Sequence, residues 1–391
     1  MGKNLTLRIR LKNVDSDTSK LFYNARSVDI TPGSRAIKTP LRALSNGDLR
    51  AKAQVPSDIT LASEIAGYHR QISGPESQKL LEGNLFPSTL TNELENSSQK
   101  MQHSDIIIPF LQPTKTAFDN VLTSYDIKIK FLRKLFRIQQ EAKMNILCVP
   151  WLNFTSTQYV KIIDLITSHE SIEPIFYFDS KAKPENLKRI VDHLIPLIES
   201  ERIHFLGILY HPVRDALTSY DVLWESLNEK NVAILLADVE RANPNLKNLS
   251  ASHINEFILG DVFLQKVFSR GKPSPKKYDL YEKFKVFNKN NLTIEGIGNY
   301  KDESWKDIIL EDFVDPEIKN TIEHYKEARD DPDKFSILKY ISKVHEFTAS
   351  SNEFEKSRVF IDKEESEVYI EEKQFLKSAL MTTKGSQKKL L

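Results

Sequence analysis

The chain of 391 residues has a single cysteine, Cys148, and this scarcity excludes several kinds of site. One thiol cannot form an internal disulfide, and it cannot supply a cysteine-based zinc or iron–sulfur cluster. A protein without either is typical of a reducing compartment, so we expect a cytoplasmic location.

Long apolar runs are missing as well. No segment approaches the length of a membrane span, and residues 1–5 do not begin the apolar region of a signal peptide. We therefore expect no membrane partner.

Neither sign of charge is in excess, since 55 Lys and Arg residues face 54 Asp and Glu residues. Any site for a polyanion must then be local. The phosphate-binding patterns G-x-x-x-x-G-K-[ST] and G-x-G-x-x-G are absent, and so is the metal-binding spacing H-E-x-x-H. The sequence predicts neither a cofactor nor a metal.

What the sequence does have is a repeated pattern between Asn145 and Leu264. Short apolar runs, each followed by an amphipathic stretch of helical period, recur at the roughly 30-residue length of a βα unit. The runs are Ile146–Val149, Ile175–Phe178, Phe205–Tyr210 and Val232–Leu236. Continuous apolar character indicates strands covered on both faces, as in a parallel sheet.

Further segments extend this pattern to a barrel. Strands are expected at Val28–Arg35, Asp105–Phe110, Ile258–Leu264 and Leu292–Ile297, and one is hidden in the polar stretch Asp48–Ser63. The total of about eight favours a (β/α)8 TIM-type barrel over an open sheet.

The predicted domain organisation places the barrel in residues 1–310, with a strand at Leu5–Leu11 that caps one end of the sheet. Residues 45–104 are expected to form an insertion with helices at Asp58–His69 and Ser73–Glu82. Residues 311–391 are expected to form a mostly helical, acidic extension, in which Glu311–Asp333 carries nine acidic and three basic residues before a frayed tail.

Candidate catalytic residues follow the predicted strands, because parallel strands gather ligands at their carboxyl ends. Asp238, Asp261 and Asp179 could divide the roles of nucleophile or base and general acid, and His211 could act as a general base. Structural roles stay open: the aspartates could cap helices, His211 could be a hydrogen-bonded rim residue, and Asp261 could pair with a base such as Arg241.

The same strand exits supply candidate substrate-binding residues. Arg241 and Glu240 follow Asp238, Trp151 follows the Ile146–Val149 run, and His253 lies on a short helix before the Asp261 strand. A surface position on that helix explains His253 equally well.

One local segment, Ser269–Asn290, is basic, with seven bases against two acids. Aromatic residues are interleaved with these bases, a pattern that suits a nucleic-acid backbone and unstacked bases. The candidate contacts are Arg270, Lys272, Lys276, Lys277, Lys283 and Lys285. Because the aromatic residues also fall at helical spacing, a helix packed on the barrel remains the alternative.

Two short stretches carry a resemblance to a known family. Ile30–Arg35 followed by Thr39–Pro40 resembles the opening strand and substrate loop of the tRNA-guanine transglycosylase superfamily, particularly its DNA-modifying 7-deazaguanine branch. Ser252–His253, with Gly260–Phe263 beyond it, is similar to the late-strand region there.

The resemblance implies a (β/α)8 barrel that exchanges guanine for a 7-deazaguanine in DNA or RNA through a covalent enzyme–sugar intermediate. Asp238 and Asp261, chosen by their strand positions, would act as nucleophile and proton-transfer group. The family's Cys-x-Cys-x-x-Cys and Asp-Ser-Gly-Gly-Phe-Gln motifs are absent here. If the chain belongs to this family, the absence of both motifs implies a divergent or non-catalytic member.

Two other functions remain open on the residues alone. The barrel could be a hydrolase, lyase or isomerase for a small molecule, with its carboxylates and His211 around a pocket. It could also be a non-catalytic scaffold that binds a protein partner through its acidic C-terminal extension.

Overall fold

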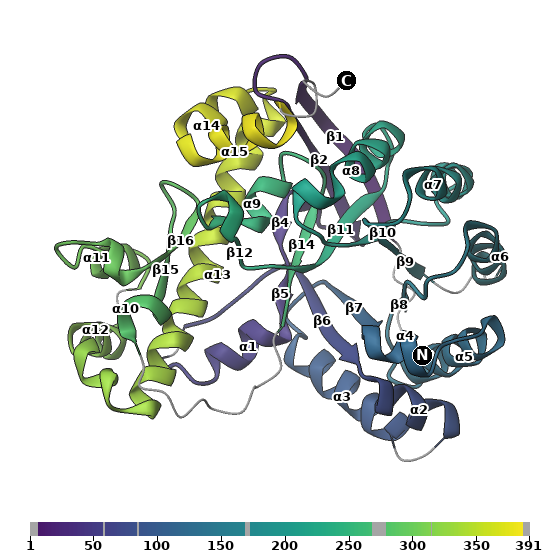
Figure 1. The fold of residues 1–391 in the computed structure, drawn as a ribbon, viewed down its shortest axis with the longest axis horizontal. Helices are drawn as coiled ribbons and strands as arrows, with labels where there is room; N and C mark the ends of the chain where they lie inside the picture. Colours follow the sequence, from purple (N-terminus) through teal and green to yellow (C-terminus); the bar gives the residue numbers. More distant parts are fainter. Residues whose placement is uncertain are drawn as a thin grey trace.

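The computed structural model describes residues 7–57, 59–83, 86–168, 173–267, 279–313 and 315–385. It is an α/β protein in which two parallel sheets are surrounded by helices, with two antiparallel sheets beside them (Figure 1). None of the helices in these ranges combines the length and apolar character needed to cross a bilayer.

The larger parallel sheet has six strands, and it contains the four apolar runs that the sequence predicted as βα units. In spatial order its strands are β4 (Leu41–Arg42), β14 (Val262–Gln265), β11 (Ala233–Val239), β10 (Phe205–Leu209), β9 (Glu173–Asp179) and β8 (Ile146–Val149). All five pairings are parallel. The prediction of a parallel sheet buried on both faces is confirmed.

The second parallel sheet consists of β5 (Leu44–Ser45), β6 (Ile65–Ile72) and β7 (Ile106–Pro113). Strand β6 lies within residues 45–104, so this stretch contributes a strand to the parallel sheets instead of forming an insertion. The helix predicted at Asp58–His69 is wrong for the same reason, because β6 begins at Ile65.

The two sheets meet at both ends. Ala43 alone separates β4 from β5, so one short segment belongs to both sheets. At the other end β7 lies beside β8, where the Leu111 N–H donates to Cys148 Sγ at 3.4 Å. Across the described residues no β-ladder joins β7 to β8.

Helices connect the parallel strands and cover their outer side, as Figure 1 shows. They are α1 (Asn46–Lys52), α2 (Gly74–Glu82), α3 (Phe86–Lys100), α4 (Lys115–Asn120), α5 (Tyr125–Glu141), α6 (Ser156–Thr167), α7 (Pro184–Glu199) and α8 (Val213–Leu227). The longer helices are amphipathic and bury one face; α7, for example, buries Leu187, Ile190, Val191, Leu194 and Ile198.

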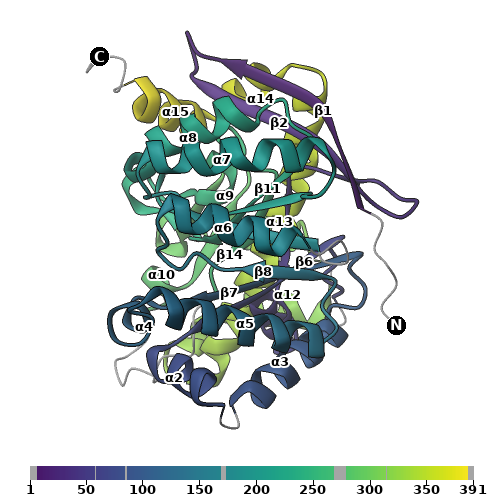
Figure 2. The same ribbon diagram turned by 90° about the vertical axis from the view of Figure 1, so that its right-hand side faces the viewer.

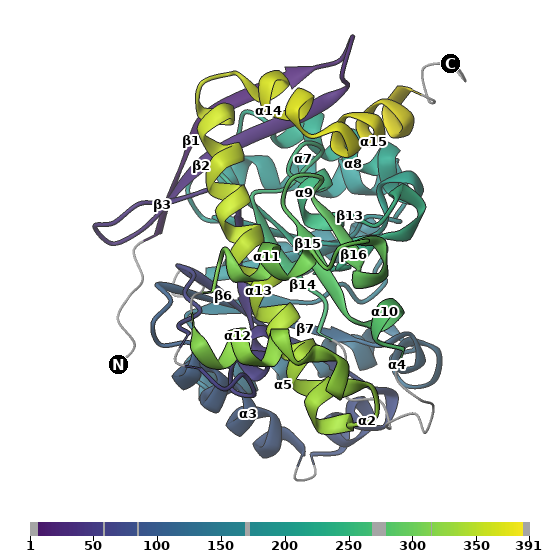
Figure 3. The same ribbon diagram turned by 90° about the vertical axis from the view of Figure 1, so that its left-hand side faces the viewer.

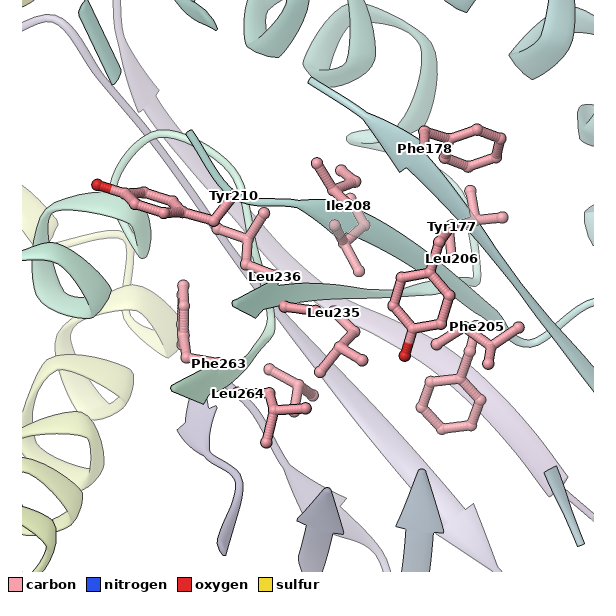
Figure 4. Packing of buried hydrophobic residues seen from close by; sticks show 14 of the residues in the cluster. Tyr177, Phe178, Phe205, Leu206, Ile208, Tyr210, Leu235, Leu236, Phe263 and Leu264 are labelled. Carbon is pink, nitrogen blue, oxygen red and sulfur yellow. The ribbon is translucent and has the colours of Figure 1, made fainter. Parts of the chain in front are cut away.

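Side chains of the larger sheet alternate between two apolar layers (Figure 4). Tyr177 points toward the second sheet, where its hydroxyl donates to the Pro109 carbonyl at 3.1 Å. Phe178 points the other way and packs edge-to-face on Tyr159 of α6. On the inner layer Leu264 approaches Gly67 so closely that a Cβ there would lie 2.4 Å from a leucine methyl group.

An antiparallel sheet of β1 (Leu7–Asp17), β2 (Tyr23–Pro32) and β3 (Ile37–Lys38) covers the amino ends of the parallel strands (Figure 2). The Asn24 N–H donates to the Phe257 carbonyl at 2.8 Å, and the Leu11 N–H donates to Asn231 Oδ1 at 2.8 Å. Both acceptors precede parallel strands. The prediction that Val28–Arg35 forms the first strand of the parallel sheet is therefore wrong: residues 28–32 belong to β2 of the antiparallel sheet, and the first parallel strands along the chain are β4 and β5.

The remaining residues form a small sheet and several helices. The antiparallel sheet has the order β12 (Ala242–Asn243), β13 (Leu249–Ser250), β16 (Thr293–Gly296) and β15 (Lys285–Asn288). The strand predicted at Leu292–Ile297 thus exists outside the parallel sheets. The helices are α9 (Ala251–Asn255), α10 (Leu280–Lys283), α11 (Trp305–Leu310), α12 (Pro316–Glu323), α13 (Pro332–Asp362), α14 (Ser366–Glu372) and α15 (Gln374–Gly385), with 3-10 turns at Pro244–Leu246, Ile297–Asn299 and Tyr325–Arg329.

Helix α13 runs along one side of the molecule from the region of α12 to α14 (Figure 3). It packs on the outer side of the larger sheet, where the Phe354 ring stacks on Phe263 of β14 at 5.1 Å. The C-terminal helices therefore share the hydrophobic core of the parallel strands.

Candidate functional site

Asp238 occupies an irregular position at the carboxyl end of β11. The pairing of β11 with β14 shifts between Ala237 and Val239, and Asp238 has a left-handed backbone with φ of 62°. Regular alternation would give Asp238 the orientation of Leu236, toward the helices. The bulge instead turns its carboxylate toward the strand ends, and such bulges are common beside active sites.

The carboxylate of Asp238 contacts His69 of β6, a residue that no motif in the sequence indicated. The Nε2 atom of His69 lies 2.8 Å from Asp238 Oδ1. Gln71 Nε2 donates to the other carboxylate oxygen at 3.5 Å, and Lys266 Nζ lies 3.7 Å from that oxygen. The His69 side chain is 2% exposed and that of Asp238 is 22% exposed, so the pair is largely shielded from water.

Several contacts fix the position of His69. It lies on the same face of β6 as Gly67, and its ring packs against Phe110 of β7 with centroids 4.8 Å apart. The Asn46 side chain holds the backbone, because its Oδ1 accepts from the His69 N–H at 3.2 Å and its Nδ2 donates to the His69 carbonyl at 3.1 Å. The other ring nitrogen, Nδ1, has no hydrogen-bond partner within the described residues.

A cavity of about 780 Å³ opens beside this pair. Its walls come mainly from the end of β6 and from α1, α2 and α3, and they combine many polar side chains with the apolar Leu49, Ala53, Met101 and Val267. The lining residues include the amides Asn46, Gln71 and Asn96, the hydroxyls Ser73, Ser97 and Thr114, and the charged residues Arg50, Arg70, Glu76, Glu93 and Lys100, together with His69 and Tyr68. The volume falls in the usual range for small-molecule sites.

Asp179 and His211, two of the predicted catalytic residues, form a second pair at the ends of β9 and β10. His211 Nε2 lies 3.0 Å from Asp179 Oδ1, and each side chain is 28% exposed. Partial burial alone would raise the pKa of Asp179, but hydrogen bonds from His211 and the Lys181 amide bring that pKa below its ordinary value. Neither residue lines the cavity at His69.

Arg241, predicted to bind substrate, joins a network under α13 instead. Its guanidinium pairs with Glu346 and donates to Ser342 Oγ at 3.1 Å. Arg42 extends the network, since its Nη2 donates to Asp48 at 3.0 Å and to Gln265 at 2.8 Å. Glu240 is half-buried at the same strand exit. These charges connect the strand ends to α13 and leave Arg241 only partly exposed.

Asp261 lies at the opposite end of the sheet from Asp238, because it precedes β14. Its carboxylate is fully buried, pairs with Arg26 at 3.2 Å and accepts from the Ile234 N–H at 2.8 Å. Burial raises the pKa of Asp261 above its ordinary value, although Arg26 opposes the rise. The basic partner is thus Arg26 and not Arg241, and Asp261 is outside the candidate site.

His253 and Trp151 are also placed by packing. The buried His253 ring lies between Phe354 and Phe287, with Nδ1 3.2 Å from Glu256 and Nε2 3.0 Å from Ser350. Trp151 is 7% exposed and packs on Tyr159. Neither residue lines the cavity at His69.

The predicted nucleic-acid segment is largely outside the described residues, which exclude Arg270, Lys272, Lys276 and Lys277. Lys283 ends α10 and Lys285 begins β15. Elsewhere in the described ranges, no group of three or more His, Cys, Asp or Glu side chains is arranged to hold a metal ion.

Comparisons with known proteins add little to this geometry. No protein-family model matches the chain, and no curated protein matches it. Among solved structures, one match is a chain of the tryptophan synthase complex from Pyrococcus furiosus. It covers 58% of this chain and 87% of that chain, with 12% sequence identity and a TM-score of 0.32. At these values the similarity assigns neither a family nor an activity.

Proposed function

We propose that the parallel strands form one (β/α)8 barrel with a seam between β7 and β8. The segment from β4 to β5 joins the two sheets, and the contact between Leu111 and Cys148 brings the other two edges together. The inward-pointing Tyr177 bridges the interior to Pro109 of β7. In this architecture the carboxyl ends of the strands form the usual active-site face.

We further propose that the protein is an enzyme that performs acid–base chemistry on a small polar molecule. The observation that carries this proposal is the His69–Asp238 bond of 2.8 Å beside the 780 Å³ cavity. The left-handed bulge fixes the backbone of Asp238, and the Asn46 side chain fixes the backbone of His69. The two side chains are therefore positioned independently of each other. Strained backbone of this kind is concentrated at functional sites.

Within this proposal, each side chain of the pair has its own role. When Asp238 accepts a hydrogen bond from Nε2–H, it orients the imidazole and leaves Nδ1 to accept a proton from the substrate or return one to it. Lys266 and Gln71 contact the Asp238 carboxylate and hold it in place. This chemistry suits an isomerase, a lyase or a hydrolase.

The base-exchange reaction implied by the family resemblance fits this arrangement less well. It needs two carboxylates near one sugar, and Asp238 and Asp261 lie at opposite ends of neighbouring strands. Asp179 is at the correct end, but β10 lies between β9 and β11, which separates the two backbones by about 10 Å. Asp179 is also bonded to His211.

A turnover screen tests the acid–base proposal. The purified protein is incubated with pools of polar small molecules, and consumption is followed by mass spectrometry for the wild type, His69→Gln and His193→Gln. His193 forms a His–Asp pair with Asp164 at 2.6 Å on the outer helices, so it is a matched control outside the site. We expect turnover in the wild type and in His193→Gln, and a loss of about 100-fold or more in His69→Gln.

Equal turnover in His69→Gln and the wild type would contradict the proposal. Absence of turnover in every pool, together with an intact fold, would favour the non-catalytic scaffold.

A further inference from the structure

Among the described residues, more basic than acidic side chains line the cavity beside His69. Three cations line it: Arg50, Arg70 and Lys100. Both acidic residues of the lining contact Arg70, Glu76 at 2.6 Å and Glu93 at 3.2 Å. Within the described ranges, neither Arg50 nor Lys100 has a carboxylate within ion-pair distance.

We propose that Arg50 and Lys100 bind an oxyanion group, a carboxylate or a phosphate, on the molecule that enters this cavity. That this molecule is also the substrate rests on the proposed function; the binding of the anion does not. Both side chains are exposed to solvent, and cations that line one concave surface raise the local concentration of anions, an effect that added salt weakens.

The positions of the two cations support one shared ligand. Arg50 comes from α1 and Lys100 from the end of α3, and both helices contact β6, the strand that carries His69. An oxyanion held by either cation lies in the cavity that His69 lines, and Asp238 contacts His69 from outside that lining. Binding energy from such a remote charged group can orient the reacting part of a substrate.

The rest of the cavity indicates the character of the remaining ligand. A volume of about 780 Å³ exceeds the size of a bare phosphate or carboxylate. Asn96 and Ser97 also line the cavity and can supply hydrogen-bond donors and acceptors, whereas Tyr68 and His69 are the aromatic rings of the described lining. A small, polar organic acid or phosphate ester fits this lining better than a stacked nucleobase.

A structural role for the two cations makes a different prediction. Arg50 and Lys100 lie in the last turns of their helices, where a positive charge stabilises the helix end. Lys52 and Lys79 occupy the same kind of position in α1 and α2, and they do not line the cavity. They therefore provide a control that removes two helix-end charges and leaves the cavity unchanged.

The test is a titration of the full-length protein with inorganic phosphate, malonate or neutral glycerol. Binding is followed through the His69 imidazole signal in NMR spectra, which reports on this cavity, and folding is checked by thermal unfolding. We expect phosphate or malonate to bind, glycerol not to bind, and added NaCl to weaken the binding. Which of the two anions binds identifies the group as phosphate or carboxylate.

In Arg50→Gln/Lys100→Gln the affinity should fall roughly tenfold or more, whereas Lys52→Gln/Lys79→Gln should bind like the wild type. Arg50→Lys keeps the charge and should retain most of the anion binding. It replaces the double variant in the test if the double variant proves unstable. If the wild type binds the anion but shows no turnover in the screen, only the proposed function is contradicted. Absence of anion binding, equal binding by the Arg50/Lys100 variant, or equal weakening in the control would overturn the inference.

Discussion

At the scale of single residues, Arg26 shows how a buried charge is held in this protein. Its guanidinium is 1% exposed and contacts Asp261 together with the carbonyls of Leu227, Asn228, Lys230 and Val232. These carbonyls end α8 and precede β11. One side chain of β2 thereby fastens the antiparallel hairpin to the amino ends of two parallel strands.

Replacing Arg26 by methionine should lower the free energy of unfolding by about 3–5 kcal/mol, because Asp261 would remain buried without its partner. Urea unfolding measures the loss. Lys12→Met is the control, since the exposed Lys12 and the half-buried Asp29 form a surface pair at 3.8 Å on the same hairpin, which should contribute less than about 1 kcal/mol. Equal losses of unfolding free energy in the two variants would show that the buried pair stabilises the fold no more than the surface pair does.

The sequence identified some members of the candidate site and missed others for identifiable reasons. Asp238 follows an apolar run, so its position at a strand end was visible. The position of His69 was not visible, because β6 has the sequence Ile-Ala-Gly-Tyr-His-Arg-Gln-Ile and lacks a continuous apolar run. Its small and polar residues point inward. The strict alternation of Gly67, His69 and Gln71 was the one available signal. Asp261 was misplaced because β14 begins at Val262, one residue after it.

At the scale of an element, the bulge in β11 controls which way Asp238 points. Its φ of 62° is a conformation in which a Cβ atom is unfavourable and glycine is not. In an ordinary strand, alanine is the more stable choice of the two. At position 238 the left-handed backbone should make glycine more stable than alanine.

Asp238→Gly should therefore be more stable than Asp238→Ala by about 1 kcal/mol, measured by chemical unfolding. Both variants lack the carboxylate, so the comparison isolates the backbone. Ala237→Gly serves as the reference, because at this neighbouring position of β11 glycine should be less stable than the alanine of the wild type. An Asp238→Ala protein at least as stable as Asp238→Gly would argue against the strained bulge.

The elements themselves were predicted best where apolar runs are continuous. The amphipathic stretches expected after the first three apolar runs correspond to α6, α7 and α8. Strands β4 and β5 each contain two residues, too few to show a period, and the sequence placed the first barrel strand in β2 instead. Which strands pair is decided by long-range contacts that a local pattern does not contain.

At the scale of the whole molecule, α13 joins the strand ends to the C-terminal helices through Glu346. This carboxylate is buried and contacts Arg241, Arg42 and Gln265. Burial alone would raise the pKa of Glu346, but the two guanidinium groups bring it below the ordinary value of 4.5. Its charge therefore stabilises the fold above that pH, and the contribution is lost as the pH falls through the lowered pKa.

Glu346→Gln should cost about 3 kcal/mol at pH 7, because Arg241 and Arg42 would lose their buried partner. The difference from the wild type should shrink as the pH falls below the ordinary carboxyl value, since protonation removes the same charge. Urea unfolding at several pH values measures both effects. Glu141→Gln, which breaks the exposed pair with Arg137 on α5, should change stability by less than about 1 kcal/mol. A cost for Glu346→Gln that does not vary with pH would contradict this account.

The most direct test of the His69–Asp238 pair is a double-mutant cycle on turnover, using whichever molecule the screen identifies. The rate constant kcat/KM is measured for the wild type, His69→Gln, Asp238→Asn and the double variant. Because Asp238 acts through His69, the double variant should be about as slow as His69→Gln alone, a loss of 100-fold or more. Losses that multiply, or a His69→Gln enzyme as fast as the wild type, would show that the two residues are not one acid–base unit.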